Sequence, residues 1–272
     1  LAILSSDQKS IDFIKKNQIS DVLNLYANSS RNIESAEIFA DSYNFEKYYG
    51  SYEDLINDKD VDFILNFLPS GIKFEYTYLC LKNNIKVITD YPIISNSNDL
   101  EHFEELINSK LINNLFLIDE INIKKLYEES VNQNIISFTK YFHQSYKLKN
   151  SLDNEDVLFE LCPELFYLIY KYRSQKISIF KKDVIIDKIT RKISYFKCDI
   201  KINKNIDVKV LLNGNNSDNQ LSNRTNEEKF MLYKSLYNTK ELNYFINSKN
   251  SFENLSIFTY YPFKLFQEVL NE

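Results

Sequence analysis

Residues 46–92 decide the fold of this chain, and they read EKYYGSYEDLINDKDVDFILNFLPSGIKFEYTYLCLKNNIKVITDYP. Two helices alternate here with two buried strands. The helices are predicted over 52–57 and 74–83, and the strands over 61–67 and 85–89. This alternation indicates βαβ units and a parallel sheet covered by helices on both faces.

The same pattern extends back to the first residue. It predicts strands over 1–4 and 22–27 and helices over 11–19 and 33–43. The last of these helices is amphipathic, because Ile33, Ala36, Ala40 and Tyr43 share one face. The fold class expected for residues 1–118 is therefore an α/β, Rossmann-like parallel-sheet domain.

The hydrophobic period changes after Glu120. Alternating, β-branched stretches predict four strands, over 135–142, 177–186, 189–202 and 206–212. Between them, Pro163 opens a helix predicted to end at Tyr172. We expect residues 119–272 to form an α+β domain with a large, mostly antiparallel sheet. It would include a polar loop over 215–228 and a closing helix over 262–270.

Composition excludes several classes of protein. The 272 residues carry a net charge of −5, which argues against a general nucleic-acid binder. No apolar run approaches the ~20 residues that span a bilayer, and no signal-peptide pattern opens the given sequence, so we expect a cytoplasmic protein with no membrane partner. The cysteines, Cys80, Cys162 and Cys198, lack the spacing of a metal or redox site and are expected to be buried apolar residues. With two distant histidines, no protein metal site is expected.

The stretch that ends in Asp90-Tyr91-Pro92 resembles the nucleotide-binding domain of the Gfo/Idh/MocA oxidoreductases. Most of that superfamily has Glu-Lys-Pro at the closing tripeptide, with the lysine in catalysis. Biliverdin reductases have Glu-Tyr-Pro, and the tripeptide here is similar to theirs. The resemblance covers residues 1–212, and it includes the 117–126 and 158–163 segments.

The first turn departs from the pattern of dinucleotide-binding folds. Such folds have G-x-G-x-x-G after the first strand, so that backbone amides can approach the pyrophosphate. Ser5, Asp7 and Ser10 occupy these positions here. A carboxylate within ~5 Å of a pyrophosphate is repulsive by roughly a few kcal/mol. Three explanations stay open: the cofactor sits differently, Lys9 compensates, or the dinucleotide site has decayed.

The resemblance nevertheless implies NADPH or NADH as cofactor. The implied cofactor-binding residues are Ser5, Ser10, Ser30, Arg31, Pro69 and Asp90. A guanidinium at position 31 can pair with a 2′-phosphate, which would favour NADPH, or it is simply solvated.

The resemblance implies hydride transfer to the central methine carbon of an open-chain tetrapyrrole, as in the reduction of biliverdin to bilirubin. The implied catalytic residues are Tyr91, Lys171 and Arg173, and the cations would hold a propionate or protonate a pyrrole nitrogen. Tyr91 could instead pack between the domains, and the two cations could be surface residues at a helix end. The implied substrate-binding residues are Glu120, Phe142, His143, Phe166, Tyr167 and Tyr170.

No lysine stands at position 91 and no histidine at 164, so sugar-alcohol oxidation is not expected. The alternative is a non-catalytic protein of the same fold that binds a bilin or a protein partner. The sequence leaves the oligomeric state open.

Overall fold

The computed structural model describes residues 1–90, 93–94, 99–118, 135–141, 165, 168–169, 172, 174, 176–186, 193–202, 206–213 and 245–247. The chain forms two compact units. Unit 1 comprises Leu1–Ile93, Asn98–Ile118 and Tyr237–Ser256. Unit 2 comprises Ile94–Ser97, Asp119–Leu236 and Ile257–Glu272.

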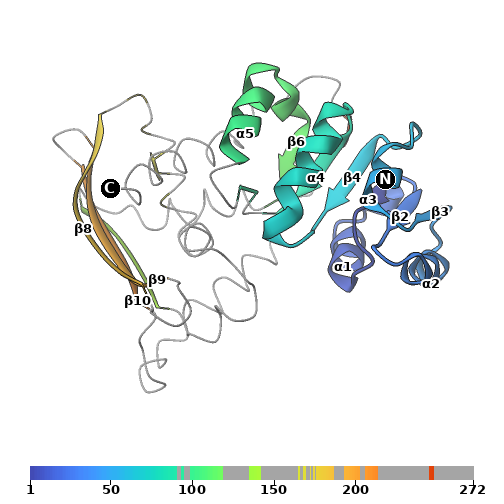
Figure 1. The fold of residues 1–272 in the computed structure, drawn as a ribbon, viewed down its shortest axis with the longest axis horizontal. Helices are drawn as coiled ribbons and strands as arrows, with labels where there is room; N and C mark the ends of the chain where they lie inside the picture. The colour runs from blue at the N-terminus through green and yellow to red at the C-terminus, as the bar shows by residue number, and fades with distance from the viewer. Residues whose placement is uncertain are drawn as a thin grey trace. The chain divides into compact units, whose positions relative to one another are not determined.

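Unit 1 contains a six-stranded sheet in which every neighbouring pair is parallel. Its strands are β1 (Ala2–Ile3), β2 (Ala27–Ser29), β3 (Lys47–Tyr49), β4 (Phe63–Asn66), β5 (Lys86–Thr89) and β6 (Leu115–Leu117). The strand order is β3-β2-β1-β4-β5-β6. Figure 1 labels β2, β3, β4 and β6 of this sheet. The predicted parallel-sheet fold is confirmed, and the sheet has the order of a Rossmann domain.

Helices connect these strands. They are α1 (Gln8–Lys16), α2 (Ile33–Tyr43), α3 (Tyr52–Ile56), α4 (Ser70–Lys82) and α5 (Asp99–Asn108), with short 3-10 turns η1 (Ile19–Asp21) and η2 (Leu111–Asn114). Local signals start the first three helices, because Asp7, Asn32 and Ser51 each accept a hydrogen bond from a backbone amide of the first turn. The predicted bounds of the 33–43 helix are those of α2.

The predicted strand over 22–27 is wrong in its bounds. β2 begins only at Ala27 and includes Asn28 and Ser29. The amides of Val22 and Leu23 still donate to the carbonyl of Ile19, at 3.0 and 2.8 Å, so this part of the chain belongs to the turn after η1 and cannot pair with a strand. Leu23 and Leu25 in this connection pack against the core, whereas Val22 is exposed.

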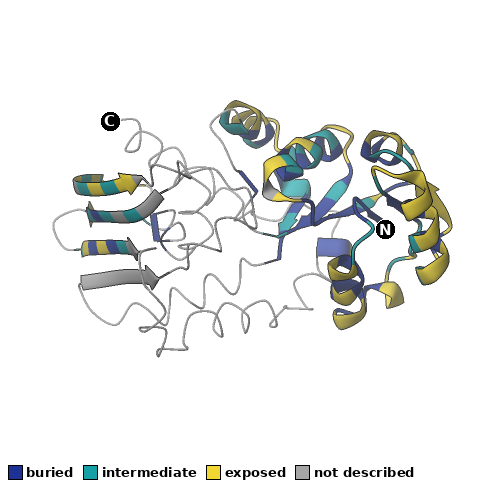
Figure 2. Cartoon of the chain, turned by 60° about the horizontal axis from the view of Figure 1, so that its bottom comes forward, coloured by how far each residue is buried: buried dark blue, intermediate teal, exposed yellow. Residues whose placement is uncertain are grey.

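The central strands are buried on both faces of the sheet, which is why their sequences are continuous apolar runs. Ile3, Ile64, Leu65, Val87 and Ile88 are all fully buried. Figure 2 shows this dark-blue interior, with exposed residues on the outer faces of the helices.

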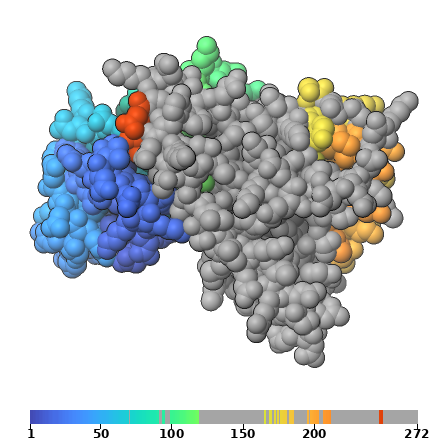
Figure 3. All heavy atoms as spheres, turned by 180° about the vertical axis from the view of Figure 1, so that it is seen from behind, coloured from blue at the N-terminus to red at the C-terminus, as the bar shows by residue number. Residues whose placement is uncertain are grey.

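Phe245 and Ile246 join this core, although they lie far along the chain. The Phe245 ring packs against Phe116 with ring centres 5.2 Å apart, and the Lys86 ammonium donates to the Phe245 carbonyl at 3.1 Å. Figure 3 shows residues 245–247, in red, beside the atoms of unit 1. Unit 1 thus includes Tyr237–Ser256 and unit 2 includes Ile94–Ser97, whereas the predicted domains are 1–118 and 119–272.

Unit 2 contains a four-stranded sheet of order β7-β10-β9-β8. Its strands are β7 (Ile135–Tyr141), β8 (Ile177–Ile186), β9 (Ile193–Ile202) and β10 (Ile206–Asn213). β8–β9 and β9–β10 are antiparallel, whereas β7–β10 is parallel, so the mostly antiparallel sheet is confirmed. Along β9 and β10, Cys198, Ile200, Val208 and Val210 are buried and alternate with more accessible residues (Figure 2).

Leu165, Leu168 and Ile169 are helical and buried within the stretch predicted to form a helix from Pro163. The polar loop predicted over 215–228 and the helix predicted over 262–270 lie outside the described residues.

Candidate functional site

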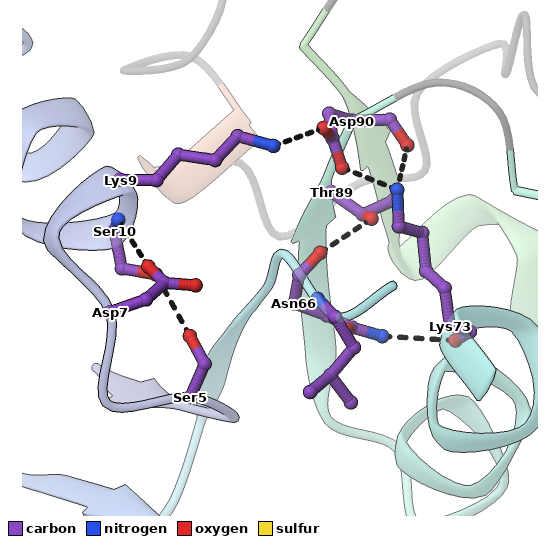
Figure 4. A network of polar contacts seen from close by, with 9 residues as sticks. Ser5, Asp7, Lys9, Ser10, Asn66, Lys73, Thr89 and Asp90 are labelled. Atoms are coloured by element: carbon purple, nitrogen blue, oxygen red, sulfur yellow. Dashed lines mark hydrogen bonds and ion pairs between the residues drawn. The ribbon is translucent and has the colours of Figure 1, made fainter. Parts of the chain in front are cut away.

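The carboxyl ends of β1, β4 and β5 meet at one edge of the unit 1 sheet. The chain runs outward from β1 to β3 on one side and from β4 to β6 on the other, so the strand order reverses between β1 and β4. Open α/β sheets bind ligands at such a reversal, outside the carboxyl ends of the strands. A network of polar side chains occupies this edge (Figure 4).

The turn between β1 and α1 satisfies its own polar groups. The Asp7 carboxylate accepts a hydrogen bond from the Ser10 amide at 2.9 Å and caps α1. The Ser5 and Ser10 hydroxyls lie 3.2 Å apart, and both residues are buried. The two predicted phosphate-binding hydroxyls are thus directed at each other inside the turn. Asp7 occupies the helix terminus that an anionic ligand would otherwise use.

Asp90 follows β5 and pairs with two lysines. Lys9, on the first turn of α1, reaches one carboxylate oxygen at 2.6 Å. Lys73, on α4, reaches the other oxygen at 2.6 Å and the Asp90 carbonyl at 3.3 Å. Figure 4 shows the two side chains approaching Asp90 from different helices. The ion pairs therefore connect α1 and α4 across the carboxyl edge of the sheet.

Burial and charge act in opposite directions on the Asp90 carboxyl. Burial raises its pKa, but the ammonium groups of Lys73 and Lys9 outweigh burial, so its pKa is lowered from the ordinary value. Asp90 is therefore ionised at neutral pH. Two ammonium groups against one carboxylate leave one positive charge on this trio.

Asn66 and Thr89, at the ends of β4 and β5, support this arrangement. The Asn66 amide donates to the Lys73 carbonyl at 3.0 Å and to the Thr77 hydroxyl at 2.9 Å. The Thr89 hydroxyl donates to the Asn66 carbonyl at 2.7 Å. Pro69 precedes α4, and its carbonyl accepts from the Lys73 amide at 3.0 Å. These contacts fix the start of α4, from which Lys73 points to Asp90.

Sequence reasoning did not identify Lys73, Asn66 or Thr89. The sequence does mark two of these residues, because Asn66 and Thr89 are polar and end two otherwise mostly apolar strands. Lys73 gave no such signal, since its burial depends on Asp90, which lies 17 positions away in the sequence.

Ser30 and Arg31 follow β2 at the same edge. The Ser30 amide donates to the Tyr49 carbonyl at 3.1 Å, and Arg31 is exposed. Burial raises the pKa of the Tyr52 phenol, the Arg31 guanidinium opposes this rise, and the Asp7 carboxylate adds to it. Arg31 and Asp7 therefore lie close enough to Tyr52 to act on the same phenol. The ends of β1 and β2 converge there, and Tyr52 is a further residue that sequence reasoning missed.

One buried acceptor lies beneath this turn. The Asn28 side-chain amide donates to the Ser6 hydroxyl at 3.0 Å and to the Ala36 carbonyl at 3.1 Å. Among the buried side-chain nitrogen and oxygen atoms of the described residues, its side-chain oxygen is the one without a hydrogen-bond partner. The donors and acceptors around the first turn are therefore almost fully used by the protein itself.

The other predicted site residues lie outside the described residues: Tyr91, Glu120, Phe142, His143, Phe166, Tyr167, Tyr170, Lys171 and Arg173. Their roles stay predictions. Within the described ranges, no group of three or more His, Cys, Asp or Glu side chains could hold a metal ion. None of the described helices is long and apolar enough to span a membrane.

A sequence model of the Gfo/Idh/MocA family, described as "Oxidoreductase family, NAD-binding Rossmann fold", matches residues 9–111. The match includes β4, α4, Asp90 and all of α1 except Gln8. Residues 9–111 are thus similar to the NAD-binding Rossmann domain of the Gfo/Idh/MocA oxidoreductases.

Two curated relatives are trans-1,2-dihydrobenzene-1,2-diol dehydrogenases. The protein from Xenopus tropicalis is 27% identical over 47% of this chain and 41% of its own length. The protein from Xenopus laevis is 33% identical over 34% of this chain and 27% of its own length. The matched part of the chain thus corresponds to less than half of either relative.

Two solved dehydrogenase structures are similar to this chain in fold. Apo scyllo-inositol dehydrogenase from Lactobacillus casei aligns with a TM-score of 0.67 at 11% identity, over 99% of this chain and 94% of that one. Myo-inositol 2-dehydrogenase from Lactobacillus plantarum aligns with a TM-score of 0.65 at 12% identity, over 99% and 95%. At such identities the likeness concerns the fold alone.

Proposed function

We propose that this chain is an NAD(P)H-dependent reductase of the biliverdin reductase type, acting on an open-chain tetrapyrrole. The observation that carries the proposal is the Asp90-Tyr91-Pro92 tripeptide at the carboxyl end of β5. It puts tyrosine where most of the family has the catalytic lysine. A reduction that needs no lysine to move an alcohol proton suits this tripeptide better than alcohol oxidation does.

The positive charge at this edge of the sheet suits a dinucleotide cofactor, whose phosphates are negative. Lys9 and Arg31 are exposed cations at the first turn and at the end of β2, where a dinucleotide's phosphates and adenosine ribose would lie. The Asp7 carboxylate opposes them, so the expected affinity is lower than that of a glycine-rich site. The nicotinamide ring, when bound, supplies the hydride.

The protein's own residues would position the substrate and stabilise charge. We infer that Tyr91 lines the substrate side of the edge and that Lys171 or Arg173 binds a propionate. Arg173, or solvent, would provide the proton for a pyrrole nitrogen. Loss of a charge-assisted hydrogen bond of this kind costs about 2 to 4 kcal/mol.

A second candidate is a protein of the same fold that no longer catalyses hydride transfer. The Asp7 cap favours it, because this carboxylate already accepts the Ser10 amide at the terminus of α1. Such a protein would bind a bilin or a protein partner without using a dinucleotide. A third possibility comes from the curated relatives, whose names specify a diol as substrate.

Purified protein incubated with biliverdin and NADPH, and separately with NADH, tests the proposal. Bilirubin is expected to appear with at least one cofactor. Arg173→Ala should lower turnover strongly, and Tyr91→Phe only modestly, while both variants keep the melting temperature. Binding of biliverdin without reduction would favour the non-catalytic candidate. Oxidation of a trans-dihydrodiol with NAD⁺ or NADP⁺ would favour the diol reaction instead.

A further inference from the structure

We propose that Lys9 is the phosphate-binding residue of this site, and that it exchanges Asp90 for the diphosphate of a bound dinucleotide. Lys9 would thereby replace part of the missing glycine-rich turn. The identity of the ligand rests on the proposed function, whereas the role of Lys9 rests on the ion pairs around Asp90.

The two lysines that pair with Asp90 differ in how firmly they are held. Lys73 has 5% of its side chain exposed and contacts both the carboxylate and the carbonyl of Asp90. It cannot leave without becoming a buried, unpaired cation. Lys9 has 46% of its side chain exposed and makes one contact with the carboxylate. A half-exposed ion pair contributes little to stability, so Lys9 is the residue that can change partners.

Asp90 keeps a counter-ion when Lys9 leaves. Lys73 already provides one full counter-charge to the carboxylate at 2.6 Å. If Lys9 moves to a ligand, Asp90 and Lys73 stay behind as a neutral pair. The positive charge of Lys9 then becomes available to an anion at the carboxyl edge.

Helix stability does not explain a lysine at position 9. Lys9 is the second residue of α1, where the helix dipole disfavours a positive charge. Its ammonium group lies 4.6 Å from the centre of the Phe67 ring, and Phe67 directly follows β4. The side chain thus lies over the strand ends, beside the place where the strand order reverses (Figure 4). The Asp90 carboxylate offsets this conflict in the ion pair, and an anion bound there would offset it once Lys9 changes partners.

Lys9 is also placed to offset the negative charge of Asp7. Asp7 caps α1 and brings a negative charge to the turn where the diphosphate would lie. Lys9 comes from the same helical turn and carries the opposite charge. Its flexible four-carbon side chain can reach a phosphate held farther from the backbone than a glycine-rich turn would hold it. A displaced diphosphate is the geometry that the side chains of Ser5, Asp7 and Ser10 require.

Lys9→Met tests the proposal, and Lys82→Met is the matched control. Lys82 pairs with Glu105 at 2.7 Å and has 41% of its side chain exposed, but it lies at the end of α4 that leads into β5. Dissociation constants for NADPH and for inorganic pyrophosphate would be measured at two salt concentrations. Lys9→Met should weaken NADPH binding about tenfold or more and reduce its salt dependence. Lys82→Met should leave both unchanged, and Lys9→Arg should largely restore binding.

Unaltered NADPH affinity in a folded Lys9→Met variant would overturn the proposal. An equal loss in Lys82→Met would overturn it too, and so would a lack of NADPH and pyrophosphate binding by the unsubstituted chain. Failure of the proposed reductase activity is distinguishable. If NADPH binds in a Lys9-dependent way but biliverdin is not reduced, the role of Lys9 stands and the reductase function fails.

Discussion

Two carboxylates of unit 1, Asp90 and Asp58, each accept hydrogen bonds from more than one side chain. Asp90 follows the carboxyl end of β5, whereas Asp58 lies in the turn that precedes the amino end of β4. In a parallel sheet these are opposite edges. Such sheets bind ligands at the carboxyl ends of their strands, which is where Asp90 lies.

The partners of the two carboxylates differ in charge. One Asp58 oxygen accepts from the Tyr49 and Tyr26 phenols at 2.5 and 2.9 Å and from Lys47 at 3.1 Å. The Asp60 carboxylate lies 3.9 Å from the same ammonium. One cation thus faces two carboxylates near Asp58, whereas two cations face one carboxylate at Asp90. At the amino ends of the strands, two carboxylates match the single ammonium group of Lys47. At the carboxyl ends, the trio of Lys9, Lys73 and Asp90 keeps one positive charge in excess.

The largest expected effect is that of Asp90→Asn on stability. The substitution leaves the Lys73 ammonium buried without a counter-ion, which should destabilise the protein by about 3 kcal/mol. Urea denaturation at neutral pH would measure the loss. Glu105→Gln, which removes an exposed partner of Lys82, is the control and should have a small effect. A loss no larger than that of the control would mean that Lys73 finds another partner.

Low pH should destabilise the fold, because it protonates both Asp58 and Asp90. Each has a lowered pKa in the folded protein: for Asp58 the Tyr49 phenol is the main cause, and for Asp90 the two lysines outweigh burial. A lowered pKa stabilises the fold fully above the unfolded-chain value of about 3.9, and this contribution is lost as the pH falls through the folded pKa. Stability should therefore decline below about pH 4. The decline should be shallower in Asp90→Asn, and an identical pH profile would contradict this account.

Asp58→Asn should have a smaller effect than Asp90→Asn. An amide oxygen can still accept from the tyrosines and Lys47, so we expect a loss of about 1 kcal/mol. NADPH affinity should not change, because Asp58 lies at the edge opposite the proposed site. Calorimetric melting of this variant would measure the loss of stability. NADPH titration would show whether this carboxylate affects binding. Weakened NADPH binding would refute the distinction.

The smallest expected effect concerns Asp7. Asp7→Asn keeps the helix cap and removes the charge, so NADPH should bind several-fold more tightly. Asp7→Gly should also tighten binding several-fold, at some cost to the stability of α1. Titration of both variants with NADPH measures the gain. Unchanged or weaker binding in both would show that the phosphates do not lie near this turn.

Much of the fold could be predicted because its signals are local. The apolar runs that became β4 and β5 reflect burial on both faces of the sheet, and the bounds of α2 follow from the Asn32 cap and an amphipathic face. The prediction failed at 22–27, where an apolar run turned out to be a connection after η1. Hydrophobicity alone does not reveal whether a segment has a free strand edge to pair with.

The sequence by itself determined the βαβ order, the loss of the glycines and the tyrosine at position 91. Tertiary structure alone decided which charges meet. Lys9 and Asp90 lie 81 positions apart, and Lys86 and Phe245 lie 159 apart. Helix caps and hydrophobic periods depend on neighbours within a few residues, so sequence reveals them. The pairing of Asp90 with two lysines depends on where β1, β4 and β5 end together, and only the folded sheet brings those ends to one edge.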